Sequence, residues 1–212
     1  MERKTAAIII AFLFLWVGCR STIDSESENL FHSQQSFNPD GSISALIEIP
    51  MGTSEKWEYD KEKGAMDIEI RNGKKRRIKY LPYPVNYGMI PQTILPKEFG
   101  GDGDPLDVLV IGESIDQGSL VSATVLGVLK FKDRGEQDDK IVAISNQFND
   151  ITCKSLKDLQ EHYPSIIAIF STWFSNYKGP GKMIFEGSEN EIIATELIQQ
   201  AHSAYKIQYK NE

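Results

Sequence analysis

Hydrophobic and polar residues alternate along several short segments in the middle of the chain, which is the period of strands with one buried face. The segment ISALIEIP (43–50) predicts a first strand that ends at its proline. The segment EKWEYDKEKG (55–64) predicts a second strand followed by a glycine turn. In MDIEIRNGKKRRIKYL (66–81), the pair Asn72-Gly73 separates two such runs and predicts a β-hairpin.

Three further apolar runs, DVLVIG (107–112), LVSATVLGVLKF (120–131) and KIVAI (140–144), predict more deeply buried strands. Between the hairpin and the first of these runs, LPYPVNYGMIPQT (81–93) is interrupted by proline and glycine. We therefore expect this connection to lack regular structure.

The spacing of apolar residues becomes helical near the C-terminus. Ser155 can cap a short helix over LKDLQEHY (156–163), and Pro164 can open a longer one that stops at KGPG (178–181). The segment SENEIIATELIQQAHSAY (188–205) predicts a last helix that begins near Ser188 or Glu189. Strands first and helices last favour a strand-rich α+β domain, a closed or partly closed β-barrel flanked by C-terminal helices.

The N-terminal segment differs from the rest of the chain. Residues 1–19 carry two basic residues, an apolar run too short to span a bilayer, and Gly18-Cys19, as in a secretory signal peptide. The small residue before Cys19 resembles a bacterial lipobox. We therefore expect an exported lipoprotein, anchored to a membrane through Cys19; an ordinary signal peptide, an uncleaved anchor and a cytoplasmic protein are the alternatives. Polar residues 20–42 predict a flexible tether before a domain over 43–212.

Composition narrows the class of partner. With a net charge of -7, the chain lacks the basic surface that sequence-independent nucleic-acid binding needs. The two cysteines give no disulfide framework and no zinc-ligand spacing. An anionic small substrate remains compatible with this charge if metals or a local basic cluster reverse the field.

Two acidic loops carry the candidate chemistry. GGDGDPLDVLVIG (100–112) places Asp102, Asp104 and Asp107 within six positions, where like charges repel unless something positive lies among them. A second loop, KFKDRGEQDDKIVAI (130–144), carries its own cluster of Asp133, Glu136, Asp138 and Asp139. Oxygen ligands at two neighbouring strand ends suit Mg²⁺ or Mn²⁺ and a phosphate-bearing substrate. Each loop taken singly can also be a solvated acidic turn.

Cationic and phenolic side chains supply candidate phosphate ligands. Lys56 and Glu58 share one face of their strand. Arg76 lies two and four positions before the apolar residues Ile78 and Tyr80, so it should share their strand face and point inward. Its planar guanidinium suits phosphate. Arg71 and Arg77 are the alternatives. The remaining candidates are Tyr83, Tyr87 and Tyr177, for which core packing is the alternative, and Lys178, which can serve a helix dipole instead.

These motifs resemble, in order, those of the family I soluble inorganic pyrophosphatases. DGDPLDVLV resembles the family signature D-x-D-P-x-D, and the resemblance extends over about residues 43–205. The supporting segments are IEIP, KWEYDKEKGAM, YPVNYGMIPQT, VLGVLKFKD with DDKIVAI, and WFSNYKGPGK. The resemblance implies an OB-like five-stranded closed barrel and a homo-oligomer. It also implies hydrolysis of pyrophosphate to two phosphates by a metal-activated water, with Mg²⁺, or Mn²⁺ in its place, as cofactor.

The resemblance also implies roles for single residues. Asp104 is the expected general base. The expected metal ligands are Asp102, Asp107, Asp133 and Asp138; the expected phosphate ligands are Lys56, Arg76, Tyr87, Lys140, Tyr177 and Lys178; and the expected outer partners are Glu48, Glu58 and Tyr83. Arg134 stands where many members carry an acidic residue. Two alternatives therefore stay open, a degenerate lipoprotein that only binds metal or phosphate and a hydrolase of another diphosphate.

Overall fold

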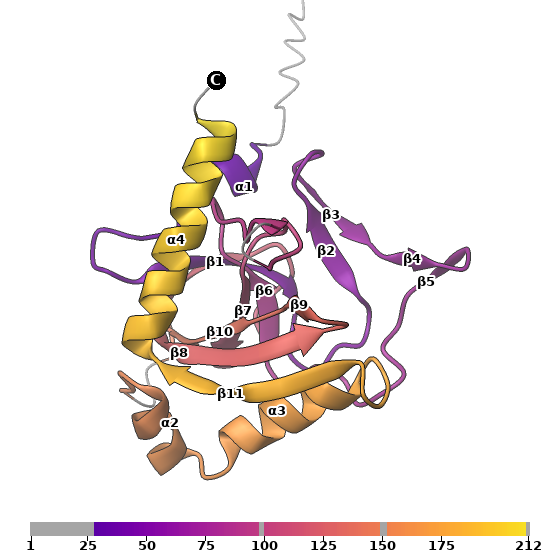
Figure 1. The fold of residues 1–212 in the computed structure, drawn as a ribbon, viewed down its shortest axis with the longest axis vertical. Helices are drawn as coiled ribbons and strands as arrows, with labels where there is room; N and C mark the ends of the chain where they lie inside the picture. The colour runs from indigo at the N-terminus through magenta and orange to yellow at the C-terminus, as the bar shows by residue number, and fades with distance from the viewer. Residues whose placement is uncertain (1–27, 98–99, 149–151, 211–212) are drawn as a thin grey trace, which may run out of the picture.

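The main sheet of the protein follows a ring-like path. The computed structural model describes residues 28–97, 100–148 and 152–210. Neighbouring strands follow the order β1-β6-β7-β10-β8, and the second pairing of β1 with β8 returns the path to its first strand (Figure 1). These strands are β1 (Ile43–Ile49), β6 (Asn86–Met89), β7 (Asp107–Ile111), β8 (Leu120–Asp133) and β10 (Lys140–Ser145).

Strand β8 is long enough to pair with different strands along its two halves. Its first half pairs with β1, and its second half pairs with β11 (Met183–Asn190). Its far end turns back into the short strand β9 (Glu136–Gln137). The second acidic loop therefore lies between β8 and β10, and the parallel pairing of β10 with β7 brings it beside the first acidic loop.

Two small hairpins form an arm beside this ring. Strands β2 (Trp57–Asp60) and β3 (Ala65–Ile68) make the first, and β4 (Ile70–Arg71) and β5 (Lys74–Lys75) make the second. Figure 1 shows the arm extending from the right-hand side of the ring. The hairpin predicted at Asn72-Gly73 is confirmed, because both residues have positive φ angles, 52° and 72°, as a type I′ turn requires.

Within the described residues, four helices accompany the sheet: α1 (Leu30–Ser33), α2 (Leu156–His162), α3 (Ile166–Asn176) and α4 (Glu191–Tyr209). The predicted cap of α2 is confirmed, since the Ser155 side chain accepts a hydrogen bond from the Asp158 amide. Strands β1, β6 and β10 of the ring are buried along their whole length, so both of their faces are covered. Leu109 and Val142 pack with α3 residues, whereas their neighbours Val108 and Ile141 pack with α4 residues.

Two predictions of secondary structure are wrong. Strand β6 lies within the segment expected to be irregular; all four of its residues are buried, so the alternation that marks a half-exposed strand is missing. Ser188 and Glu189 belong to β11 rather than to the last helix, whose cap is Asn190. A strand therefore follows α3, and the simple order of strands first and helices last does not hold.

The expected tether is also shorter than predicted. Residues 1–27, which contain Cys19 and the signal segment, lie outside the described residues. The described remainder of the tether packs onto the domain: Phe31 is fully buried, and the hydroxyl of buried Ser36 donates to the Pro91 carbonyl. Burial of an aromatic side chain fixes this segment to the domain, so the prediction is wrong for residues 28–42.

Candidate active site

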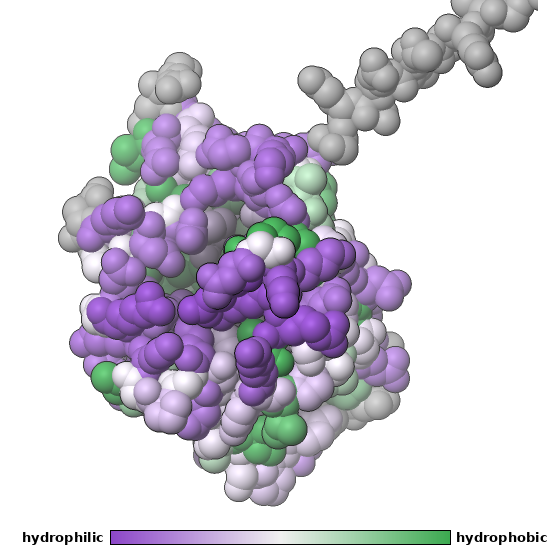
Figure 2. All heavy atoms as spheres, turned by 90° about the vertical axis from the view of Figure 1, so that its right-hand side faces the viewer, coloured by the Kyte–Doolittle hydropathy of each residue, from purple (hydrophilic) through white to green (hydrophobic). Residues whose placement is uncertain are grey.

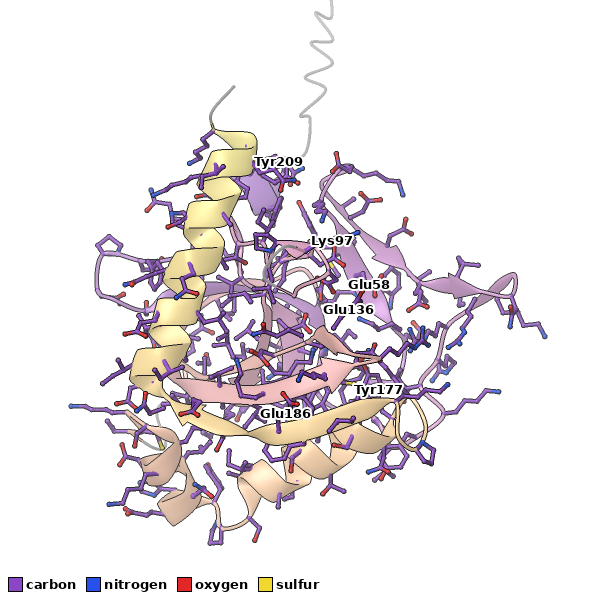
Figure 3. All side chains as sticks on the ribbon, viewed as in Figure 1. Glu58, Lys97, Glu136, Tyr177, Glu186 and Tyr209 are labelled. Carbon is purple, nitrogen blue, oxygen red and sulfur yellow. The ribbon has the colours of Figure 1, made fainter. Side chains whose placement is uncertain are left out.

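A polar cavity of about 640 Å³ lies between the ring, the arm and the end of α3. Figure 2 shows hydrophilic side chains gathered around a hollow on the face that carries the arm. In Figure 3, Glu58 of β2 and Tyr177 after α3 lie on this side of the ring. The predicted site residues that line it are Glu48, Lys56, Glu58, Arg76, Tyr87, Asp102, Asp104, Asp107, Asp138, Lys140, Tyr177 and Lys178. Asp133 and Tyr83 contact the lining instead: Asp133 pairs with Lys178, and Tyr83 packs against Tyr87.

Lys140 lies among the carboxylates of both acidic loops. It pairs in register with Asp107 across the parallel strands β10 and β7. Its ammonium contacts the Asp107 carboxylate and lies 2.5 Å from Oδ1 of Asp138, and its side chain is only 1% exposed. Burial alone would lower the pKa of Lys140, but Asp107 and Asp138 outweigh it and raise the pKa above its usual value. The lysine is therefore charged across the physiological range.

Lys178 repeats this arrangement from the other side. It follows α3, and its ammonium lies 2.7 Å from Oδ2 of Asp133 and 3.6 Å from Oδ2 of Asp138. Burial would raise the pKa of Asp138, but Lys140 and Lys178 overcome that effect and lower it. The Asp138 carboxylate is thus held in its ionised form by the two neighbouring ammonium groups.

The arm contributes a second buried lysine, Lys56. Lys56 and Glu58 lie on the same face, as predicted, with 3.1 Å between Nζ and Oε1. The Lys56 ammonium also lies 5.0 Å from the centre of the Tyr87 ring, within cation–π range. Burial raises the pKa of neighbouring Glu48 to about 7, against the opposing effect of Lys56. Glu48 accepts a hydrogen bond from the Tyr59 amide at 2.7 Å, which ties β1 to the arm.

The three candidate arginines occupy different places. Arg76 lines the cavity, and its half-buried guanidinium contacts the carboxylate of Glu69. Arg77 points away and pairs with Glu55 at 2.9 Å, with 64% of its side chain exposed. Arg71 is exposed in the distal hairpin. Of the three, Arg76 is the one that the structure places beside the other cations of the cavity.

The first acidic loop is more open than the second. Asp102 accepts the backbone N–H of Asp104 at 2.9 Å. Burial raises the pKa of Asp102, and the neighbouring carboxylates Asp104 and Asp107 add to this. Asp104 has 67% of its side chain exposed, and its Oδ1 lies 2.9 Å from the Lys61 ammonium. The loop thus presents two exposed carboxylates, those of Asp102 and Asp104, to the cavity.

Aromatic rings form the wall behind these groups. Tyr177 stacks on Trp173 with 4.7 Å between ring centres, and buried Tyr83 packs between Trp173 and Tyr87. Burial raises the pKa of Tyr83 and of Tyr87 above the ordinary value, so both phenols stay protonated and can donate hydrogen bonds.

The donor set fits a hard divalent cation. Among the described residues, no three His, Cys, Asp or Glu side chains are already gathered as a metal site. However, Oδ1 of Asp133 and Oδ2 of Asp138 are buried without a hydrogen-bond partner in the described structure. A buried, ionised carboxylate oxygen needs such a partner. A divalent cation bound among these carboxylates would supply one, and oxygen ligands are those that Mg²⁺ prefers.

Two residues around the cavity, Lys61 and Glu69, were missed by the sequence analysis, and a third, Asp139, was counted in the second acidic loop without a role of its own. Lys61 binds Asp104, and Glu69 binds Arg76. Asp139 is buried; it accepts the Phe131 amide at 3.0 Å and contacts Lys130, so it fixes the base of the second acidic loop. The alternation of Glu69 with Ile68 and Ile70 in the sequence could have pointed to it, although it lies between β3 and β4 in the structure. No local signal pairs Lys61 with a loop more than 40 residues later.

Cations and carboxylates share one polar cavity at the ends of the strands of an α+β domain, and this combination suits a phosphate-bearing anion and a divalent metal. Residues 45–206 match the family model described as inorganic pyrophosphatase. The chain is 38% identical over 77% of its length to an inorganic pyrophosphatase of Halalkalibacterium halodurans, covering 95% of that protein. This chain belongs to the inorganic pyrophosphatase family.

Solved structures agree with this assignment. The inorganic pyrophosphatase of Schistosoma japonicum superposes with a TM-score of 0.78 at 28% identity, over 83% of this chain and 70% of that one. The type I inorganic pyrophosphatase of P falciparum gives a TM-score of 0.76 at 26% identity, over 85% of this chain and 64% of that one. The family and its strand-rich α+β fold are therefore as the sequence predicted.

Proposed function

We propose that this chain is a metal-dependent inorganic pyrophosphatase that hydrolyses pyrophosphate to two phosphates. The observation that carries the proposal is the convergence of Lys56, Arg76, Lys140 and Lys178 on the cavity that the two acidic loops also line. Pyrophosphate carries about three negative charges near neutral pH, and these cations complement it. The carboxylates provide for metals that neutralise the remaining charge.

The proposed division of labour follows the positions of the groups. Lys56, Arg76, Tyr87, Lys140, Tyr177 and Lys178 bind the two phosphates and stabilise charge on the departing one. Asp102, Asp107, Asp133 and Asp138 would hold Mg²⁺, or Mn²⁺ in its place. When bound, the metal supplies charge neutralisation for the phosphate oxygens and makes water a stronger acid. Asp104, the accessible carboxylate, takes a proton from the attacking water.

Residues behind the cavity position these groups. Glu58 orients Lys56 through their ion pair, and Glu48 ties the arm to β1. Tyr83 packs against Tyr87 and Trp173 and so supports the two tyrosines of the lining. The chemistry needs no covalent nucleophile, because phosphoryl transfer to water depends on alignment and charge neutralisation.

Three further parts of the proposal concern assembly and location. The return pairing of β1 with β8 supports an OB-like, five-stranded closed barrel. The Gly18-Cys19 pair after an apolar run supports a lipid anchor and an exported, membrane-attached enzyme. Within residues 28–210, apart from the two undescribed internal gaps, no helix is long and apolar enough to cross a membrane. The family resemblance supports a homo-oligomer.

Phosphate release from pyrophosphate by the purified chain in Mg²⁺ tests this proposal. The competing function is binding of metal or phosphate without turnover, which Arg134 favours because it takes the place of an acidic residue. Calorimetric binding of phosphate without phosphate release would support that alternative. Faster hydrolysis of a nucleoside diphosphate than of pyrophosphate would support a different diphosphate substrate.

A further inference from the structure

The segment just before the family-matched region is built into the domain. The match begins at residue 45, but Phe31 is already fully buried, with its ring 5.3 Å from that of Tyr205 on α4. The side-chain amide of Gln92 donates to the His32 carbonyl at 2.6 Å. These contacts hold α1 at a fixed place beside the arm.

Asn29 joins this segment to the turn between β2 and β3. Its Oδ1 caps α1 by accepting the Phe31 amide at 3.1 Å, while its Nδ2 donates to the Lys61 carbonyl at 2.7 Å. A Cβ built on Gly64 would come within 3.0 Å of the Asn29 side chain, so the turn and the segment lie in direct contact. The Tyr59 hydroxyl accepts the Leu30 amide at 2.8 Å and adds a second link.

From this turn, the Lys61 side chain reaches the first acidic loop. Its ammonium donates to the Gly103 carbonyl and to Oδ1 of Asp104, both at 2.9 Å. The backbone of Asp104 is held separately, because its carbonyl accepts the Leu95 amide at 3.0 Å. Lys61 therefore acts on the orientation of the carboxylate, which would otherwise rotate freely at its exposed position.

We propose that Lys61 is a positioning residue for Asp104, and that Asn29 holds the turn from which Lys61 reaches it. The inference rests on the proposed role of Asp104 as the base. Through the turn that carries Lys61, Asn29 thus connects α1 to the part of the cavity that contains Asp104. A carboxylate held in one orientation abstracts a proton more effectively than one that samples several.

The test compares Lys61→Met with Lys63→Met in the purified full-length chain, at saturating Mg²⁺. Lys63 lies on the same turn but pairs with Asp60 and Asp67, away from Asp104. We expect Lys61→Met to lower kcat about tenfold with KM changed less than about twofold, the range found when a supporting contact is lost. Lys61→Arg should restore most of kcat, and Lys63→Met should resemble wild type within about twofold. A raised KM with unchanged kcat would instead make Lys61 a substrate ligand and overturn the inference.

The role of Asn29 is tested by Asn29→Asp, which keeps the cap oxygen and removes the donor to Lys61. We expect kcat to fall about threefold in the wild-type background and not to fall further in the Lys61→Met background, as coupled residues behave. Equal losses in both backgrounds would overturn the link. Asp104→Asn distinguishes failure of the proposed base from failure of the positioning role. If this variant stays active, Asp104 is not the base. If it is inert while Lys61→Met has wild-type kcat, only the positioning role fails.

Discussion

Lys140 and Asp107 occupy paired positions on the parallel strands β10 and β7, and their side chains form an ion pair in the floor of the cavity. The same ammonium contacts Asp138, so one buried charge joins the two acidic loops. The repulsion among the crowded carboxylates is therefore reduced by a lysine of the chain itself. Metal would then add to a cluster that is already partly neutralised.

Loss of this buried charge should destabilise the protein most when metal is absent. Lys140→Met leaves Asp107 and Asp138 without their shared counter-ion, which costs about 3 kcal/mol when one partner of a buried pair is removed. We expect this loss in urea denaturation with EDTA and a smaller loss with Mg²⁺. Lys132→Met, which removes a half-exposed ion pair with Glu186, should change stability by less than about 1 kcal/mol. Equal losses for the two variants would contradict the buried-cation account.

Glu48 should make stability depend on pH. Burial raises its pKa in the folded protein from 4.5 to about 7, so the folded state keeps a proton that the unfolded state releases within this window. Stability contributed at Glu48 therefore falls as the pH rises from 4.5 toward 7. Glu48→Gln keeps an acceptor for Tyr59 but cannot ionise. In metal-free buffer, the Tm of the variant relative to wild type should be higher at about pH 8 than at about pH 5. The same difference at both pH values would show that Glu48 does not titrate in this window.

Arg76 and Arg77 form a matched pair for testing the phosphate site. Arg76 lines the cavity, whereas Arg77 pairs with Glu55 outside it. We expect Arg76→Met to lower kcat/KM for pyrophosphate about 100-fold, as the loss of a charge-stabilising donor does, and Arg77→Met to change it less than about twofold. If Arg77→Met gives the larger loss, the arginine has been assigned wrongly.

Cys19 should be required for attachment of the protein to a membrane. If its thiol carries the lipid, Cys19→Ser will appear in the soluble fraction of cells while its specific activity stays at the wild-type value. Fractionation of both proteins, with activity measured in each fraction, checks this directly. A variant that still sediments with membranes would contradict the lipid anchor.

The strands and the carboxylates of the site could be read from the sequence because their signals are local. Asp107 opens an apolar run, and Asn72-Gly73 divides two alternating runs, so the order of residues alone places them. Strand β6 gave no such signal: it is buried on both faces, and Asn86 within it is satisfied by backbone groups of Val110 and Glu113. The Ser-Glu-Asn end of β11 is equally typical of a helix start, and only its pairing with β8 makes it a strand.

Contacts between distant segments could not be predicted, because no local sequence signal specifies them. Lys61 and Asp104 meet because β2 and β3 fold back toward the first acidic loop, and nothing local to either residue specifies that approach. The burial of Phe31 could not be predicted, because this single aromatic residue lies in a polar stretch without periodicity. Such long-range pairs depend on the fold as a whole.

The most direct test of the central claim is phosphate release from pyrophosphate by the purified wild-type chain and by Asp104→Asn, with Mg²⁺ and with EDTA. The account predicts turnover by the wild type that requires Mg²⁺, and a loss of about 10³-fold in Asp104→Asn, within the range for removing a general base. A folded wild-type protein that releases no phosphate at saturating Mg²⁺ would contradict it.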